Sequence, residues 1–363
     1  MNILFFITSL DVGGAERQVL DLARRLISRN HNVLIVYLTG SGRLISSDKS
    51  VRAIGLGSTK SICGGIRSFL TLRALIKSFK PDVVHSHMVH ANLLARLVRL
   101  VTHVPRLICT AHSNNEGGRL RMYAYRMTNF LADVTTNVSR GAVEAFESKG
   151  AVKHGQMLVV PNGIDTDKFS FDELSRSNIR SAEGISANEK VILAVGRLVA
   201  AKDYPCLLGA FEILCRVDKA ITLWIIGDGE LKSELIALCK ELEIFNRVKF
   251  FGMREDVAGF YSATDVYVLS SAWEGFGLVV AEAMSTERVV VATDCGGVKE
   301  VVGEEGGLIV RPGKVEELAA TIRLALDMDT SAARALGRRA RQRVIDNYSL
   351  DAVVTTWANL YAP

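Results

Sequence analysis

Short apolar runs alternate with amphipathic segments along the chain. The apolar runs predict strands at 2–7, 33–38, 82–86, 106–111, 133–137 and 157–160, and again at 190–195, 221–226, 247–251, 265–269, 288–292 and 307–310. The amphipathic segments predict helices at 15–29, 65–80, 90–101, 119–131 and 140–149, then at 204–216, 230–243, 278–286, 314–327 and 331–346. Strands with near-continuous apolar character are typical of parallel sheets that are buried on both faces. The pattern therefore predicts an α/β protein with two doubly wound, Rossmann-like domains.

The predicted join between the domains is the turn-forming cluster at 161–163. A length of 363 residues also favours two domains. The charge balance changes sign near this point. Residues 1–165 carry 21 Lys and Arg against 10 Asp and Glu, a net of +11, whereas residues 166–363 carry 23 against 29, a net of −6. We therefore expect the first domain at 1–163 and the second from 164 onward.

The basic first half favours an anionic partner, such as a lipid surface or a phosphorylated acceptor. A chance excess on a solvated surface is the alternative. No nucleic-acid-binding motif accompanies the charge, so we expect no nucleic-acid partner. Six scattered cysteines without a C-x-x-C pair are typical of reduced thiols in the cytoplasm. The first residues predict a buried strand rather than a signal peptide. No apolar run approaches the roughly 20 residues of a membrane span.

Parallel sheets bind ligands beyond the carboxyl ends of their strands, so we expect the ligand-binding residues in the strand-to-helix loops. The first such loop, at 9–17, contains Gly13 and Gly14 just before a predicted helix. Glycines there let backbone N–H groups approach a phosphate at the helix N-terminus. The loop does not match G-x-G-x-x-G, which argues against a dinucleotide fingerprint. A tight turn without a ligand is the alternative.

The most informative loop lies at 270–284, where Glu274 and Glu282 flank a glycine-containing turn. Eight residues span about 12 Å even if wholly helical, which exceeds the roughly 5–9.5 Å between the two carboxylates of a glycosidase. Two acids so far apart suit opposite ends of one extended ligand. Four N–H groups between them can cradle a phosphate at the helix N-terminus, those of Gly275, Phe276, Gly277 and Leu278.

This segment resembles the E-x7-E motif of the retaining, GT-B-fold glycosyltransferases of family 4. Further motifs of that family recur in order over nearly the whole chain. They are the glycine loop at 13–17, the strand at 82–87, the interdomain signature at 160–169, the Val-Gly-Arg-Leu run at 195–198 followed by Lys202, and the strand and turn at 225–230. Each motif alone is weak, but their order makes the resemblance specific.

The resemblance implies roles for several residues. Arg197 and Lys202 would neutralise the departing diphosphate in place of a metal ion, because a guanidinium and an ammonium suit that charge. Glu274 would contact the transferred sugar and Glu282 the ribose, while Arg254 would lie near the base. The family's acceptor-side histidine corresponds to His112, which follows the predicted strand at 106–111. A histidine can hydrogen-bond a sugar hydroxyl or move a proton.

The resemblance also implies the division of labour. The first domain would bind the acceptor, the second (164–346) would bind the nucleotide sugar, and a last helix at 347–363 would cross back to the first domain. Transfer would retain the anomeric configuration and need no cofactor or metal. The implied donor is a UDP-sugar carrying a hexose or N-acetylhexosamine. The implied acceptor is a polyprenyl-diphosphate-linked glycan in O-antigen or capsule synthesis. A nucleotide-sugar epimerase of the same fold and a non-catalytic sugar-nucleotide-binding scaffold are the alternatives.

Other features of the sequence are weaker. The histidines His85, His87 and His90 lack a carboxylate or cysteine complement, so we do not predict a metal site there. We likewise reject the two D-x-D pairs at 165–167 and 327–329 as metal sites. The segments at 66–80 and 119–127 are basic and amphipathic. Together with the basic first half, they suggest peripheral contact with an anionic membrane at its cytoplasmic face.

Overall fold

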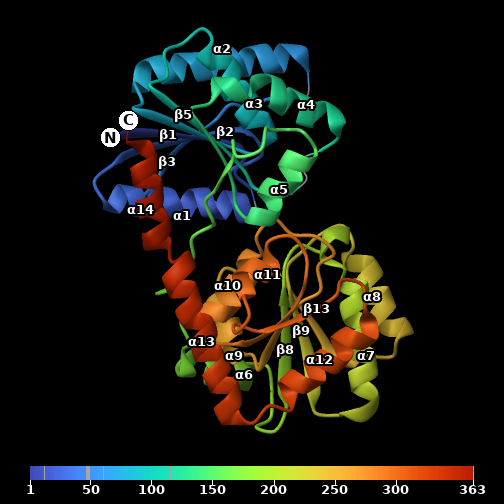
Figure 1. Ribbon diagram of the computed structural model, residues 1–363. Coiled ribbons are helices and arrows are strands. Elements are labelled where there is room, and N and C mark those ends of the chain that lie inside the picture. Colours follow the sequence, from blue (N-terminus) through green and yellow to red (C-terminus); the bar gives the residue numbers. More distant parts are fainter. Residues whose placement is uncertain (12, 46–49, 60, 115–116, 363) are drawn as a thin grey trace. The chain divides into compact units, whose positions relative to one another are not determined.

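The computed structural model describes residues 1–11, 13–45, 50–59, 61–114 and 117–362, and its chain divides into two compact units (Figure 1). Unit 1 consists of Met1–Gly163 together with Leu350–Pro363, and unit 2 consists of Ile164–Ser349. Each unit is a parallel sheet with helices on both faces. We describe them separately.

The sheet of unit 1 has seven strands in the order β3-β2-β1-β4-β5-β6-β7, and its pairings are parallel. The strands are β1 (Asn2–Ser9), β2 (Asn32–Thr39), β3 (Arg52–Gly55), β4 (Val83–His87), β5 (Arg106–Ala111), β6 (Val134–Asn137) and β7 (Leu158–Val159). Six of them confirm predicted strands. The seventh, β3, was not predicted because it is a short edge strand without a buried apolar run.

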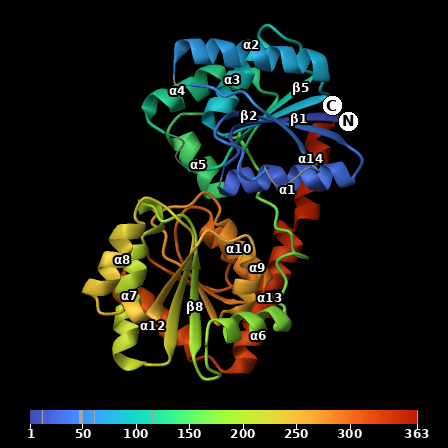
Figure 2. The ribbon, with the colours of Figure 1, turned by 180° about the vertical axis from the view of Figure 1, so that it is seen from behind.

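Two layers of helices cover this sheet (Figure 2). One apolar cluster joins β1 to α1 (Gly14–Ser28) and α14 (Leu350–Tyr361). A second cluster, built on the alternate residues of β1, joins the sheet to α2 (Ile62–Phe79) and α3 (Val89–Arg99). A third lies around Tyr125 and Phe146, where α4 (Arg119–Thr128) meets α5 (Arg140–Ser148). The predicted helix at 119–131 ends at Thr128 and continues as the 3-10 turn Asn129–Leu131.

The last helix, α14, belongs to the core of unit 1. Four of its buried residues pack on α1 and the sheet: Leu350, Val353, Val354 and Trp357. Asp351 forms ion pairs with Arg25 (3.0 Å) and Arg29 (2.8 Å) of α1. The helix begins at Leu350, three residues later than predicted, because the backbone of Ser349 is extended.

The sheet of unit 2 has six parallel strands in the order β10-β9-β8-β11-β12-β13. They are β8 (Lys190–Val195), β9 (Ile221–Ile226), β10 (Val248–Gly252), β11 (Val266–Leu269), β12 (Val289–Thr293) and β13 (Leu308–Val310). All six match predicted strands to within one residue. One face packs on α7 (Tyr204–Val217), α8 (Lys232–Glu241) and α12 (Val315–Leu326).

The remaining helices of unit 2 are α6 (Glu173–Ala182), α9 (Val257–Ala263), α10 (Leu278–Ser285), α11 (Val298–Val302) and α13 (Thr330–Tyr348). Three of them, α6, α9 and α11, were not predicted. Helix α6 has no buried residue and therefore no apolar stripe to read. Polar contacts hold it instead, because Arg176 and Arg180 pair with Asp265 at 2.7 and 3.0 Å. Helices α9 and α11 have seven and five residues, too few to establish a helical period.

Candidate active site

The candidate site of unit 2 lies where the strand order reverses. Strands β8 and β11 are neighbours, but β9 and β10 continue on one side and β12 and β13 on the other. Such a switch point leaves space for a ligand beyond the strand ends. The loops that follow β8 and β11 are joined there. The N–H of Ala272 donates to the carbonyl of Ala201 (2.9 Å), and the hydroxyl of Ser270 donates to the carbonyl of Lys202 (2.8 Å).

Two residues singled out in the sequence meet at this point. The ammonium of Lys202 pairs with the carboxylate of Glu274, and Ser271 donates a hydrogen bond to the same carboxylate oxygen at 2.9 Å. The two charged side chains are only 17% and 15% exposed, so the pair is largely shielded from water. Arg197 lies in the same loop, two residues after the end of β8, where it is exposed and makes no ion pair among the described residues. This loop therefore carries both an unpaired guanidinium and a paired ammonium.

Two glycines let these loops pack closely. Gly227 has a φ of +140° and lies against the backbone of Gly196, so that a Cβ would overlap the carbonyl oxygen of Gly196. Gly296 has a φ of +56°, and a Cβ there would overlap the carbonyl oxygen of Glu274. Only glycine combines these backbone conformations with such close approach. In the sequence, Gly227 lies in the strand-and-turn motif at 225–230, whereas Gly296 is marked only by its position shortly after β12.

The turn between the two acids leads into α10. Gly277 precedes the helix with a φ of +89°, a left-handed conformation that glycine adopts without strain. Phe276 is buried, and its ring packs edge-on against that of Tyr348 with centroids 5.4 Å apart. Its side chain is therefore part of the core, and only its backbone can meet a ligand. The N–H groups at the start of α10, those of Leu278 and Val279, precede the first backbone bond of the helix, from Val280 to Gly277 (2.9 Å). Such groups at a helix N-terminus can bind an anion.

The second acid, Glu282, lies on α10 and is only 5% exposed. Its Oε2 atom accepts a hydrogen bond from the hydroxyl of Tyr261 at 2.8 Å. The sequence did not single out Tyr261, because it lies on the short helix α9 that was not predicted. Arg254 lies apart from this group, after the edge strand β10. Its guanidinium binds both carboxylate oxygens of Asp256, at 2.8 and 2.6 Å.

In unit 1 the strand order reverses between β1 and β4, and the glycine loop follows β1. Gly13 precedes α1 and Gly14 is its first residue, while Val12 of the same loop lies outside the described residues. Glu16 folds back over the loop, where it accepts a hydrogen bond from the hydroxyl of Ser9 at 2.7 Å. A Cβ at Gly13 would overlap that carboxylate. A carboxylate of the chain thus lies against the loop where the sequence suggested a phosphate.

His112 follows β5, and its side chain is half-buried. Its Nδ1 is buried, and its Nε2 is hydrogen-bonded. Its Nε2 lies 2.9 Å from Nδ1 of His87, the last residue of the neighbouring strand β4. Burial lowers the pKa of His112 to about 4, so the ring is neutral near pH 7. The sequence suggested His112 but gave no indication of this bond.

His85, on the same face of β4, has a different environment. Its Nδ1 lies 2.8 Å from the hydroxyl of Tyr361, and its Nε2 lies 2.7 Å from the hydroxyl of Thr110. Both ring nitrogens therefore have partners within unit 1. Within the described residues, no group of three or more His, Cys, Asp or Glu side chains is placed to hold a metal ion.

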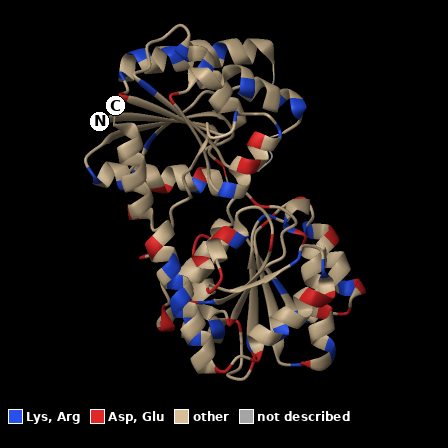
Figure 3. Cartoon of the chain, in the orientation of Figure 1, with Lys and Arg blue, Asp and Glu red and all other residues tan. Residues whose placement is uncertain are grey.

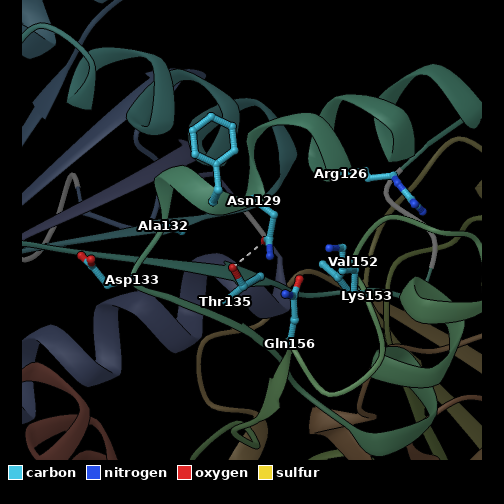
Figure 4. Close-up of a pocket in the computed structure, with 9 residues that line it drawn as sticks. Arg126, Asn129, Ala132, Asp133, Thr135, Val152, Lys153 and Gln156 are labelled. Atoms are coloured by element: carbon cyan, nitrogen blue, oxygen red, sulfur yellow. Dashed lines mark hydrogen bonds between the residues drawn. The ribbon is translucent and has the colours of Figure 1, made fainter.

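Two pockets open beside α4 in unit 1. The larger, of about 980 Å³, lies at the start of the helix between Arg119, Tyr123 and Lys149. The smaller, of about 430 Å³, lies beyond the end of the helix (Figure 4). It is lined by Asn129 and Thr135, which share a hydrogen bond of 2.8 Å. Both are lined by Arg126, so basic groups border both openings.

Two family models match successive parts of the chain. Residues 12–168 match Glycosyltransferase Family 4, and residues 175–343 match Glycosyl transferases group 1. The chain belongs to the family 4 glycosyltransferases. The resemblance noted in the sequence is confirmed.

Two relatives illustrate the range of this glycosyltransferase family. The UDP-Gal:alpha-D-GlcNAc-diphosphoundecaprenol alpha-1,3-galactosyltransferase of Escherichia coli is 24% identical over 330 residues, which cover 86% of this chain and 84% of that protein. The glycogen synthase of Mycobacterium tuberculosis is 27% identical over 386 aligned positions, covering 96% of this chain and 91% of that protein. One name specifies a lipid-linked sugar and the other glycogen, so membership of the family leaves the acceptor open.

The crystal structure of HepE from Anabaena, in complex with UDP and glucose, superimposes with a TM-score of 0.86. The two sequences are 22% identical, and the match covers 99% of each chain. This likeness shows that the two parallel-sheet units of the glycosyltransferase have the GT-B fold, as predicted.

Proposed function

We propose that this glycosyltransferase moves a hexose or N-acetylhexosamine from a UDP-sugar to a polyprenyl-diphosphate-linked glycan during surface polysaccharide synthesis. The observation that carries the donor side is the pair of Lys202 and Glu274 at the switch point of unit 2, on the loop that also carries the exposed Arg197. The UDP bound in the Anabaena structure and the UDP-Gal and diphosphoundecaprenol in the name of the Escherichia coli relative support the choice of donor and acceptor.

In the proposed reaction, the bond between the anomeric carbon and the diphosphate breaks, and the electron pair leaves with the diphosphate. Arg197 and Lys202 stabilise the charge that develops there, so the reaction requires no metal ion. Lys202 exchanges its partner Glu274 for a phosphate oxygen, which frees the carboxylate to accept hydrogen bonds from the sugar. The acceptor oxygen bonds to the anomeric carbon on the face that the diphosphate leaves, and its proton passes to the diphosphate. The configuration is therefore retained.

We assign the remaining donor contacts from the family resemblance noted in the sequence. Backbone N–H groups of 275–278 hold the diphosphate, and Glu282, oriented by Tyr261, binds the ribose. Arg254 contributes near the base, and Gly13 and Gly14 contribute from unit 1. His112 faces the sugar as a neutral imidazole, because its lowered pKa leaves it uncharged near pH 7.

The acceptor side rests on the surface of unit 1. Exposed apolar residues follow α4 and its 3-10 extension: Leu120, Tyr123, Met127 and Phe130. Arg119, Arg121 and Arg126 lie among them, and the unit as a whole is rich in basic residues (Figure 3). On α2, the exposed residues Ile62, Ile66 and Leu70 are spaced four apart and share one side. Apolar side chains ringed by arginines suit the surface of an anionic membrane, where a lipid-linked acceptor would be found.

No helix in the described part of the chain has the length and apolar character of a membrane span. We therefore propose peripheral contact with the inner face of the cytoplasmic membrane through α2 and α4. Co-sedimentation with vesicles of phosphatidylglycerol and phosphatidylcholine tests this. We expect preference for the anionic vesicles and its loss in the double variant Leu120→Ser and Phe130→Ser. Leu174→Ser, on an exposed apolar residue of unit 2, is the matched control. Equal binding to both vesicle types would remove the membrane proposal.

Thermal unfolding with nucleotides tests the donor site. At a UDP concentration 100 times its Kd, binding adds about 2.7 kcal/mol of stability, which raises the Tm of a domain of this size by roughly 5–11 °C. We expect UDP to act more strongly than GDP or ADP, with no effect of EDTA, and the shift to disappear in Arg197→Ala. Arg216→Ala, an exposed arginine of α7 paired with Glu212, serves as the control. Stabilisation that Arg197→Ala leaves intact would contradict the proposed site. Sugar-epimer formation without an acceptor would favour an epimerase instead.

A further inference from the structure

Three imidazoles lie in a row in unit 1. His85 and His87 are separated by Ser86 on β4, and their ring centroids are 4.0 Å apart. His87 pairs in register with Thr110 of β5, two residues before His112, and the centroids of the His87 and His112 rings are 5.2 Å apart. His85 and His87 are buried within the unit. The proposed function uses His112 but assigns nothing to His87.

Of the two ring nitrogens of His87, only Nδ1 has a hydrogen-bond partner among the described residues. Its Nδ1 lies 2.9 Å from Nε2 of His112. Its Nε2 is buried and has no hydrogen-bond partner among the residues that the structure describes. The ring of Phe5 lies on one side, with its centroid 5.5 Å away, and the ring of His85 lies on another. His87 therefore makes its polar contact through Nδ1 with His112.

Burial lowers the pKa values of both His87 and His112, so both rings are neutral near pH 7. A hydrogen bond between two neutral imidazoles needs one N–H donor and one lone pair. The outer nitrogens, Nε2 of His87 and Nδ1 of His112, are both buried. The bond therefore couples the two tautomers: if His87 donates, both rings carry the proton on Nδ1, and if His112 donates, both carry it on Nε2.

We propose that His87 is a positioning residue for His112: through this hydrogen bond it fixes the orientation of the His112 ring and couples the tautomers of the two rings. The inference rests on the proposed function, in which His112 faces the donor sugar. A histidine presented to a sugar must hold one orientation, because a misplacement of about 1 Å in a substrate contact can lower the rate about 100-fold. The bond from His87 supplies that constraint from a buried strand rather than from a loop.

The decisive experiment compares His87→Asn with His87→Gln. The asparagine amide is as many bonds from Cα as Nδ1 is, whereas the glutamine amide reaches only the position of Nε2. Transfer would be measured from UDP-[14C]galactose to a long-alkyl α-D-GlcNAc diphosphate. We expect kcat/KM to fall about 100-fold in His87→Gln and His87→Leu but less than about 10-fold in His87→Asn. The exposed His103→Leu is the control and keeps wild-type activity. Equal activities of the Asn and Gln variants would overturn the proposal.

A second measurement reads the tautomer without turnover. In protein labelled with ¹⁵N at its seven histidines, long-range ¹H–¹⁵N spectra distinguish Nδ1–H from Nε2–H imidazoles. We expect His87 and His112 to carry the proton on the same nitrogen, both on Nδ1 or both on Nε2, and the signals of His112 to change in His87→Asn and His87→Gln. Protons on different nitrogens in the two rings would contradict the inference.

Activity measurements distinguish a failure of the proposed role of His112 from a failure of the positioning role of His87. Full activity in His112→Ala would remove the proposed role of His112 itself. Loss of activity in His112→Ala, with wild-type activity in the variants of His87, would overturn the positioning role alone.

Discussion

The cluster around Asp265 links α6 to the sheet of unit 2, and removing its charge should destabilise that unit. The carboxylate accepts hydrogen bonds from Arg176 (2.7 Å), Arg180 (3.0 Å) and the backbone N–H of Val191 (2.8 Å). The three side chains are 12–21% exposed. In Asp265→Asn the side-chain oxygen can still accept from Val191, but two shielded guanidinium groups lose their counter-charge.

The expected loss in the free energy of unfolding depends on the hydrogen bonds that Arg176 and Arg180 keep in Asp265→Asn. Breaking a buried pair by removing one partner costs about 3–5 kcal/mol. Arg176 and Arg180 keep bonds to carbonyls such as those of Thr264 and Glu189, so the lower end, about 3 kcal/mol, applies. For a domain of this size, that corresponds to a fall in Tm of roughly 6–12 °C.

Tryptophan fluorescence can report this unit alone. Of the three tryptophans, Trp224 and Trp273 are in unit 2, so a Trp357→Phe background confines the signal to it. The control is Asp327→Asn, whose exposed pair with Arg323 should contribute less than about 1 kcal/mol. If the two variants melt within a degree of each other, the reasoning about the cluster is wrong.

The pH dependence gives a further check on Asp265. Burial would raise the pKa of this carboxyl, but the charges of Arg176 and Arg180 and the Val191 N–H outweigh that effect and lower the pKa below the ordinary 3.8. The contribution of the cluster is therefore complete above pH 3.8 and is lost as the pH falls through the lowered value. The difference in Tm between wild type and Asp265→Asn should be full near neutrality and shrink only in acid.

Two more predictions concern a loop of the proposed donor site and the buried His85 of unit 1. Gly296→Ala would force a methyl group into the carbonyl oxygen of Glu274, so we expect a loss of at least about 2 kcal/mol and, in thermal shift, a much weaker response to UDP. Gly313→Ala, at a φ of +69° but in open space, should cost only about 1 kcal/mol. Tyr361→Phe would leave Nδ1 of His85 without its partner and cost about 1–3 kcal/mol, seen as faster hydrogen exchange in β4. A Gly296→Ala protein that binds UDP normally, or unchanged exchange in Tyr361→Phe, would contradict these readings.

Much of the fold could be predicted because parallel strands buried on both faces have unbroken apolar runs. The strand at 221–226 is such a case, with six consecutive buried residues. Helix α6 could not be predicted, since ion pairs to Asp265, far along the chain, replace the apolar stripe that marks a helix. The edge strand β3 also lacks a pattern that marks it, because its two end residues are exposed, its two middle residues are only half-buried, and none is fully buried.

For the candidate site, the sequence identified residue types and loops but not pairings. Nothing in the order of residues shows that Lys202 and Glu274 bind each other, because strand adjacency decides which loops meet. The contact of Tyr261 with Glu282 crosses 21 positions, and that of His87 with His112 crosses 25. In the sequence, His85, His87 and His90 suggested only a metal site to reject, and nothing linked His87 to His112, since a hydrogen bond between two imidazoles has no spacing rule.

The position of α14 has a consequence for biosynthesis. The helix lies in unit 1 although it follows all of unit 2 in the chain, so the ribosome makes it after residues 164–349. Unit 2 is continuous in sequence and can close as soon as it emerges. Unit 1 emerges first, but the part of α1 and of its sheet that packs on α14 stays exposed until that helix is made. Domains usually fold from the N-terminus during synthesis. Here the order of completion is reversed, because unit 1 gains its last core helix only after unit 2 has been synthesised.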